Sequence, residues 1–205
     1  MYVYAFDDET YDVLNKGAYE SLSVISLKEF ESPELLAVKG GRTPAEYCWT
    51  CTPQIIFDAI NRFNLDHCTY LDADLFFFGN PEVLLEEMGE KTVLITAHRY
   101  SPAYDMSQTS GIICVLFMYF LNEKSSLEVL KWWKDACLDW CYARGEDGKF
   151  GDQKYLDDWL TRFDCVHSLR HLGGGLAPWN IAQYEISSEA NRLLGKQKGD
   201  GAEFD

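Results

Sequence analysis

The sequence predicts an α/β domain in which a largely parallel sheet is flanked by helices. Segments of strand character alternate with segments of helical apolar spacing along the 205 residues, as expected when helices connect parallel strands. A hydrophobic fraction of 47%, with six Trp, twelve Tyr and twelve Phe, is ample for a buried core. No internal repeat or interdomain linker interrupts the pattern. We therefore expect one domain over residues 1–194.

In the first part of the chain, short apolar stretches bounded by charged or turn-forming residues indicate strands at 2–6, 22–25, 68–71 and 75–78. Helices are expected at 9–16, in one or two pieces at 26–37, and at 45–63, where apolar residues recur at helical spacing. Pro44 suits an early position in the helix of residues 45–63, and Pro53 is expected to interrupt that helix or to begin its second half.

The later part continues the alternation. Strands are expected at 92–97, 111–120 and 165–168, and helices at 81–88, 125–141 and 151–160. Asn80 and Pro81 suit the cap and the first position of the helix at 81–88. After Leu194 the sequence is rich in Gly and Lys and has no apolar pattern, so residues 195–205 are expected to form a disordered tail.

Charge restricts the partners. Lys and Arg number 18 against 33 Asp and Glu, which gives a net charge of −15. A surface this acidic repels nucleic acid and anionic membranes, so neither is expected as a partner. The longest apolar run, at 112–121, is about half of what a transmembrane segment needs, and the first residues lack the pattern of a signal peptide. Seven cysteines scattered through apolar segments indicate reduced thiols and a cytoplasmic protein.

The most informative motif is Asp72-Ala73-Asp74, which lies between two apolar segments. Two Asp separated by one residue in an extended chain project to the same side. Their oxygens are hard ligands suited to Mg²⁺ or Mn²⁺, and such a cation neutralises a diphosphate leaving group. The alternative is that the strand ends at Leu71 and both Asp lie in a solvated turn.

Residues 70–81, Tyr-Leu-Asp-Ala-Asp-Leu-Phe-Phe-Phe-Gly-Asn-Pro, resemble the Asp-x-Asp strand of GT-A-type, nucleotide-sugar-dependent glycosyltransferases. Further stretches resemble the preceding helix and the signatures of a bacterial group related to glycogenin-like retaining enzymes: 42–53, 130–142, 151–159 and 176–181. The resemblance covers about residues 1–184. It implies a GT-A fold, a UDP-sugar or other nucleotide-sugar donor, bound Mn²⁺ or Mg²⁺, and transfer of a hexose to a carbohydrate, lipid or protein hydroxyl with retained configuration. The bacterial group further implies a place in surface polysaccharide or lipopolysaccharide synthesis.

The resemblance also implies roles for single residues. Asp152 and Gln153 match a pair that lies beside the donor sugar, and His171 matches a third metal ligand beside Asp72 and Asp74. Asp152 has a structural alternative as a helix cap, and His171 as an ordinary loop histidine.

Weaker hypotheses concern the substrate-binding residues. Gly174, in the run Gly173-Gly174-Gly175, offers bare backbone that can approach a ligand closely. Trp179 and Asn180 are expected on the acceptor side, and Arg42 beside the donor phosphate.

Two other classes of function stay open. The chain begins at the equivalent of the family's second strand and lacks a His-containing closing segment, which suits a truncated or inactive relative that binds nucleotide or carbohydrate. Cys48-Trp49-Thr50-Cys51 is the pattern of a redox protein, although no strand leads into it. Cys48 and Cys51 would alternatively pair with Cys137 and Cys141 in a zinc site, and packed thiols are the plainer interpretation.

Overall fold

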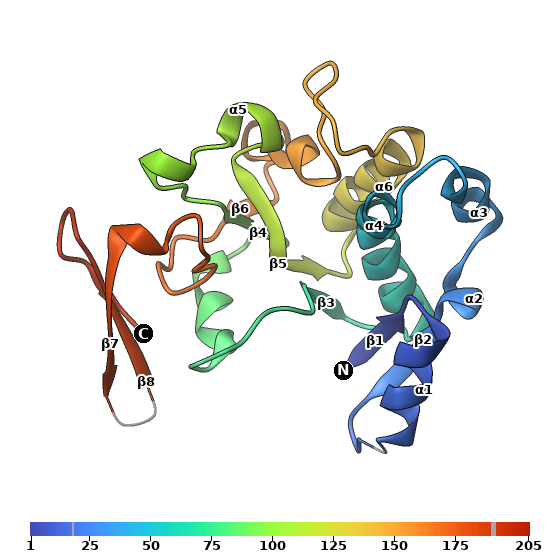
Figure 1. The fold of residues 1–205 in the computed structure, drawn as a ribbon, viewed down its shortest axis with the longest axis horizontal. Helices are drawn as coiled ribbons and strands as arrows, with labels where there is room; N and C mark the ends of the chain where they lie inside the picture. Colours follow the sequence, from blue (N-terminus) through green and yellow to red (C-terminus); the bar gives the residue numbers. More distant parts are fainter. Residues whose placement is uncertain (18, 190–191) are drawn as a thin grey trace.

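A small β-α-β unit begins the chain (Figure 1). In it, β1 (Tyr2–Ala5) and β2 (Ser23–Ser26) pair in parallel on either side of α1 (Asp8–Lys16) in the sequence. The structure is a computed structural model, and it describes residues 1–17, 19–189 and 192–205. Asp7 caps α1 by accepting the Thr10 amide hydrogen bond. The two strands form a sheet of their own, separate from the central sheet.

Three helices follow: α2 (Leu27–Phe30), α3 (Pro33–Lys39) and α4 (Pro44–Arg62). Thr43 and Glu46 form a capping box at the start of α4. The prediction that Pro53 interrupts this helix is wrong, because α4 continues through it for 19 residues. Packing explains the tolerance: Pro53 is buried, and α4 lies against α6 and the central sheet.

The central sheet contains β3 (His67–Leu71), β4 (Val93–Ala97), β5 (Ile113–Leu121) and β6 (Val166–Ser168), in the order β3-β5-β4-β6. The pairing of β5 is antiparallel with both β3 and β4, and only β4 and β6 pair in parallel. The prediction of a largely parallel sheet is therefore wrong. Between β4 and β5 the chain forms only short helical turns, so β5 returns antiparallel beside β4.

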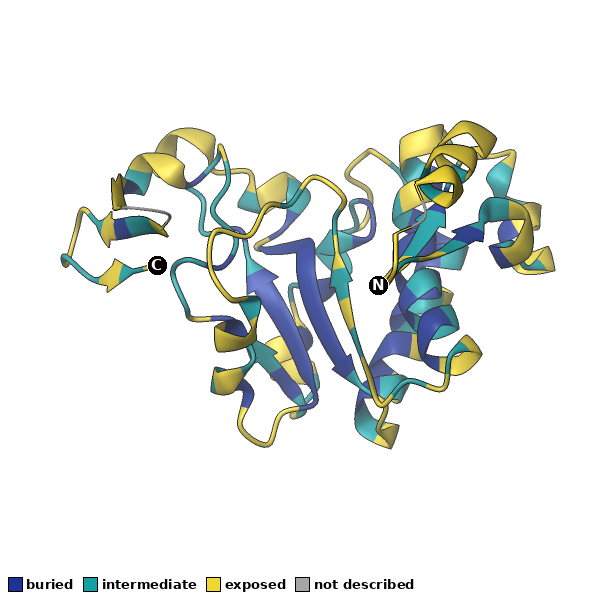
Figure 2. Cartoon of the chain, turned by 90° about the horizontal axis from the view of Figure 1, so that it is seen from below, coloured by how far each residue is buried: buried dark blue, intermediate teal, exposed yellow. Residues whose placement is uncertain are grey.

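The core lies on both faces of this sheet. On one face α4 and α6 (Lys124–Asp139) pack against β5, with Trp133 and Trp159 completely buried. On the other face the short 3₁₀ turns η1 (Pro81–Leu84) and η2 (Glu86–Met88) contribute Leu84 and Met88. Figure 2 shows β5 as the most continuously buried strand. Its apolar sequence is typical of a strand covered on both sides.

The remaining elements are short helical turns and strands, two of which contribute the buried Leu156 and Trp159 to the core. They are η3 (Pro102–Tyr104), α5 (Ser107–Ser110), η4 (Gln153–Leu156), α7 (Trp159–Arg162), η5 (Ile181–Gln183), β7 (Tyr184–Glu189), β8 (Arg192–Gln197) and β9 (Glu203–Phe204). The last three strands form an antiparallel sheet. No helix in the described ranges is both long and apolar enough to cross a membrane.

Four expected segments differ from the structure. Residues 75–78 form no strand, because the chain turns after Asp72, whose amide makes the last hydrogen bond to β5. Residues 81–88 and 151–160 form short 3₁₀ turns, with α7 beginning only at Trp159, rather than continuous helices. Residues 195–205, expected to be a disordered tail, contain the end of β8 and all of β9. There the Phe204 ring meets Tyr184 edge-on at 5.2 Å.

Candidate functional site

A cavity of about 540 Å³ opens beside the carboxyl end of β3 and the start of β5. The cavity is lined by residues of α4, of the segment 70–74, of β5 and of the loop before η4: Cys48, Trp49, Thr52, Tyr70, Asp72, Ala73, Asp74, Cys114, Val115, Asp152 and Gln153.

Asp72 and Asp74 both line this cavity, although they do so from a turn. The strand ends at Leu71, and the Leu75 amide lies 3.4 Å from the Asp72 carbonyl oxygen that it donates to. The expectation of an extended chain through the two Asp is therefore wrong, and the alternative that the strand ends at Leu71 is confirmed. Asp72 is half-buried and Asp74 is exposed.

Asp72 is held by its own strand. The Tyr70 hydroxyl donates a hydrogen bond of 2.8 Å to Asp72 Oδ1. Burial raises the pKa of Asp72 to about 6, and the nearby charge of Asp74 acts in the same direction, while the Tyr70 hydrogen bond opposes both. The carboxyl group of Asp72 therefore changes its protonation state at about pH 6.

Asp152 comes from a much later part of the sequence, lines the same cavity and is only 5% exposed. Burial raises its pKa to about 7, with the charge of Asp72 adding to the shift and a hydrogen bond from the Thr52 side chain opposing it. The Trp133 indole N–H donates to the Asp152 carbonyl oxygen at 2.9 Å and fixes the backbone there. Asp152 stands at the cap position of η4, but its side chain makes no capping hydrogen bond, so the cap does not account for this buried carboxylate.

Gln153 lines the same cavity next to Asp152. Its side-chain amide donates to the Ser110 carbonyl oxygen at 2.7 Å, which orients the group. Among the described residues, none of those lining the cavity is Lys, Arg or His. Three carboxylates face this space without a cationic side chain, so the site favours a positively charged occupant.

The expected three-ligand metal site is not assembled. Within the described ranges, no three His, Cys, Asp or Glu side chains are grouped so that they could hold a metal ion. His171 is absent from the cavity lining, and its Nδ1 instead accepts a hydrogen bond from the Gly173 amide at 3.2 Å. That geometry matches the loop-histidine alternative.

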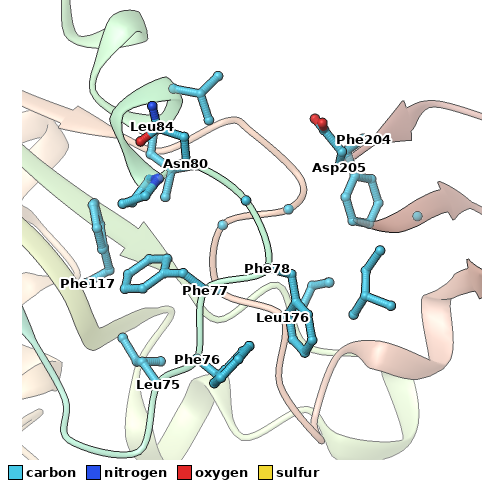
Figure 3. A pocket seen from close by; sticks show the side chains of 18 of the residues that line it. Leu75, Phe76, Phe77, Phe78, Asn80, Leu84, Phe117, Leu176, Phe204 and Asp205 are labelled. Atoms are coloured by element: carbon cyan, nitrogen blue, oxygen red, sulfur yellow. The ribbon is translucent and has the colours of Figure 1, made fainter. Parts of the chain in front are cut away.

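Gly174 lies in a second, largely apolar cavity of about 260 Å³ (Figure 3). Its walls come from the Phe-rich loop after Asp74, β5, the Gly-rich loop and the last sheet, with Leu75, Phe76, Phe77, Phe78, Leu116, Phe117, Leu176, Ile186 and Phe204 among the lining residues. A side chain at Gly174 would collide with Leu169, so the loop packs closely only with glycine there. Asp74 lines the first cavity, and the next residue, Leu75, lines the second.

Trp179 and Asn180 line neither cavity. Asn180 is fully buried and donates hydrogen bonds of 2.9 Å to the carbonyl oxygens of His98 and Gly175. Trp179 donates its indole N–H to the same His98 oxygen at 3.1 Å. The structure therefore gives both residues a part in holding the loop after β6 against the end of β4.

Arg42 also lies outside the cavity lining. Its guanidinium donates to the Thr50 hydroxyl and, at 2.7 Å, to the Leu138 carbonyl oxygen, and it lies over the Tyr142 ring. These contacts connect the start of α4 to the end of α6. The phosphate contact expected for Arg42 has no counterpart in this geometry.

The structure adds lining residues that the motifs did not reveal. Tyr70 lies on β3, two positions before Asp72, which directly follows the last residue of that strand, and both line the cavity. Cys48, Trp49 and Thr52 lie at helical positions i, i+1 and i+4 of α4 and share one face. Helical spacing in the sequence contained this signal, but only the fold shows that the face meets Asp72.

Among the described residues all seven cysteines are free, and no group of three or more His, Cys, Asp or Glu side chains there could hold a metal ion. Cys48 and Cys51 lie inside α4 rather than at its first residue. Burial raises the pKa of Cys48 and raises that of Cys51 to about 12. A reactive thiol needs the opposite shift.

Fold and cavity together define a mixed α/β protein with a carboxylate-lined site at the end of its central sheet. The chain is 30% identical over 197 residues to the uncharacterized protein YfnD of Bacillus subtilis, a match that covers 94% of this chain and 63% of YfnD. It is 30% identical over 203 residues to the uncharacterized protein YfnF of the same organism, covering 95% of this chain and 67% of YfnF. The chain thus belongs to the family of these two proteins and spans about two thirds of their length. No family model and no solved structure matches it.

Proposed function

We propose that this protein is a GT-A-type glycosyltransferase that moves a sugar from a nucleotide-diphosphate donor, with a UDP-sugar as the first candidate, to an acceptor hydroxyl. The observation that carries the proposal is the meeting of Asp72 and Asp74 with Asp152 and Gln153 in one cavity. These pairs lie almost eighty residues apart in the sequence. The resemblance assigned them to the diphosphate and to the sugar of one substrate, and a shared cavity is what that assignment requires.

The chemistry of the cavity suits a divalent cation. Asp72 and Asp74 supply hard oxygen ligands, the ligands that Mg²⁺ and Mn²⁺ prefer. Without a bound cation, burial and mutual repulsion disfavour the ionised forms of Asp72 and Asp152. A cation between them would therefore lower both pKa values. When bound, the ion would neutralise the charge that grows on the departing diphosphate.

The residues of the chain then have distinct tasks. In the proposed step, the bond from the anomeric carbon to the diphosphate oxygen breaks and a bond from the acceptor oxygen forms. The diphosphate leaves with the electron pair, and the acceptor proton passes to it or to water. Asp152 and Gln153 face the positive charge that develops on the sugar. The Tyr70 hydroxyl holds the carboxylate of Asp72 in place, and the Thr52 side chain lies beside Asp152. Retention of anomeric configuration belongs to the proposal, and an inverted product would exclude it.

Calorimetry with UDP tests the binding half of the proposal. The wild type is titrated with UDP in the presence and absence of Mn²⁺, alongside Asp72→Asn, Asp74→Asn and the surface control Asp164→Asn. We expect binding that requires Mn²⁺ and falls at least tenfold in the two site variants only. Equal binding by Asp72→Asn contradicts the assignment of the diphosphate site, and absence of UDP binding in the wild type excludes UDP as the donor nucleotide.

Release of nucleotide tests the catalytic half. A panel of UDP-sugars is incubated with Mn²⁺, and UDP release is compared between wild type and Asp152→Asn. We expect slow release by the wild type and little by the variant. Binding of UDP without release or transfer to any simple sugar acceptor would instead support the second hypothesis, a non-catalytic nucleotide-binding relative.

A further inference from the structure

Trp49 is an aromatic residue of the cavity to which neither the motifs nor the proposed chemistry gives a role. It lies on α4, is half-exposed, and lines the cavity with Asp72, Asp74 and Asp152. We propose that its indole is the surface on which the pyranose ring of the donor packs, which makes Trp49 a specificity-determining residue for the sugar. This inference rests on the proposed function and deepens it.

The position of the ring is set by the loop before Asp152. Gly151 has φ +52°, and a Cβ placed on it would lie 3.3 Å from Cε3 of Trp49. The six-membered ring of the indole therefore lies against bare backbone immediately before Asp152, and a side chain at Gly151 would both strain the backbone at this positive φ and press on the ring. Phe150 supports the ring from the same loop, with ring centres 6.2 Å apart. The indole is thus held in place before any ligand binds.

The surroundings match the two-sided character of a pyranose. A hexose ring presents C–H groups on its faces and hydroxyls around its edge, so it binds best where an aromatic face is close to carboxylate and amide groups. The cavity has this combination, with Trp49 next to Asp152 and Gln153.

Location favours the sugar over the nucleotide base. The contact with Gly151 puts the indole beside Asp152 and Gln153, the residues that face the anomeric carbon in the proposed reaction. The diphosphate belongs to Asp72 and Asp74 on the turn after β3. Since the base lies beyond the diphosphate in a nucleotide sugar, a residue at the sugar end should discriminate donors from free nucleotides.

The experiment measures two affinities for each variant. Calorimetry with Mn²⁺ compares free nucleoside diphosphates with their glucose conjugates, using the uridine, guanosine, adenosine and thymidine series. The variants are Trp49→Ala, Trp49→Phe and Gly151→Ala. Trp132→Ala is the matched control, because Trp132 is also half-exposed on a helix but packs against Arg162 outside the cavity. Circular dichroism establishes that each variant is folded before it is titrated.

We expect Trp49→Ala to weaken binding of the sugar conjugate about tenfold while leaving the free diphosphate within twofold, as the loss of one aromatic stack implies. Trp49→Phe should recover most of that loss, Gly151→Ala should resemble Trp49→Ala in direction, and Trp132→Ala should change neither affinity. Equal loss for diphosphate and conjugate would overturn the inference, because the ring would then serve the nucleotide. Unchanged binding by a folded Trp49→Ala would overturn it too, while leaving the proposed function intact. A wild type that binds no member of the four series contradicts the proposed function itself, and this inference with it.

Discussion

The Tyr70 hydroxyl donates a hydrogen bond of 2.8 Å to Asp72 Oδ1, across two residues of the same strand end. This contact stabilises the ionised carboxylate at a place where burial favours the neutral acid. Through this hydrogen bond, the position of Tyr70 on β3 influences the protonation state of Asp72 in the cavity. The first prediction tests that connection.

Tyr70→Phe should raise the pKa of Asp72 above its value of about 6, by roughly one unit, because the donor that favours the charged form is gone. A cation binds the carboxylate and not the acid, so Mn²⁺ affinity should weaken as pH falls through 7 in the variant and through 6 in the wild type. Mn²⁺ titrations between pH 5 and 8 measure this. Tyr155→Phe is the control, since its hydroxyl donates to the Trp140 carbonyl oxygen away from the cavity. Identical pH profiles for wild type and Tyr70→Phe would disprove the link.

Asp152→Asn should stabilise the protein, and more at pH 8 than at pH 5. Burial raises the pKa of Asp152 from 3.8 to about 7, so the folded protein binds this proton more tightly than the unfolded chain. The free energy of unfolding then falls as pH rises from about 4 to 7, by on the order of a few kcal/mol. The Asn variant avoids this loss.

Thermal denaturation with EDTA at both pH values measures the effect. We expect a gain in Tm of about 5 °C or more at pH 8 and a smaller gain at pH 5. Asp164→Asn, at an exposed position, should change little at either pH. A gain of the same size at both pH values would show that the pKa of Asp152 is not raised in the folded protein.

Cys48 should be the cysteine that reacts fastest with a thiol reagent in the folded protein. It is exposed, whereas Cys51, Cys137 and Cys141 are buried. Although the residue is exposed, partial desolvation of its thiol raises the pKa, so the rate should be low at neutral pH and increase toward pH 9 and above. Cys48→Ser should abolish the fastest phase.

The same reaction reports on the cavity, which Cys48 lines. UDP with Mn²⁺ should slow the Cys48 phase severalfold and leave the slower phases unchanged. Reduction of insulin by the protein would contradict this account and revive the redox hypothesis.

Trp133→Phe should destabilise the fold by about 2–3 kcal/mol. Trp133 is completely buried, packs edge-on against Trp159, and donates its indole N–H to the Asp152 carbonyl oxygen. The variant leaves a void and an unpaired buried carbonyl. Urea denaturation measures the loss, and the half-exposed Trp132→Phe should cost less than about 1 kcal/mol. Equal losses for the two variants would mean that the contact with Asp152 contributes nothing.

Phe76→Ser should leave stability within about 0.5 kcal/mol, although it removes a large apolar side chain. Phe76 is 76% exposed at the wall of the second cavity (Figure 3). Binding of the dye ANS should decrease, because the variant has less exposed aromatic surface at this cavity. Phe117→Ser, at a buried position of the same wall, is the contrasting variant and should lose several kcal/mol. A large loss of stability in Phe76→Ser would show that the loop is packed rather than exposed.

Local sequence patterns predicted most elements because their causes are local. Pro44 at the start of α4, the helical spacing through α4 and α6, and the apolar run of β5 each act within a few residues. Segments whose outcome depends on a distant partner were predicted less well. The aromatic run 75–78 has strand composition, but no neighbouring strand continues beside it, so it forms a loop.

For the site, the sequence by itself determined the acidic charge, the Asp72-Ala73-Asp74 pair and the Asp152-Gln153 pair. Only the tertiary structure decided which residues share a cavity. The fold brings Trp49, Tyr70 and Asp152 to one cavity. It places His171 and Arg42 in hydrogen bonds to other parts of the protein, outside the lining of that cavity. It also makes β5 antiparallel to its neighbour β4, where a largely parallel sheet was predicted. The physical reason is that a carboxylate's chemistry is a property of its side chain, whereas its pKa and its neighbours depend on burial between elements far apart in the chain.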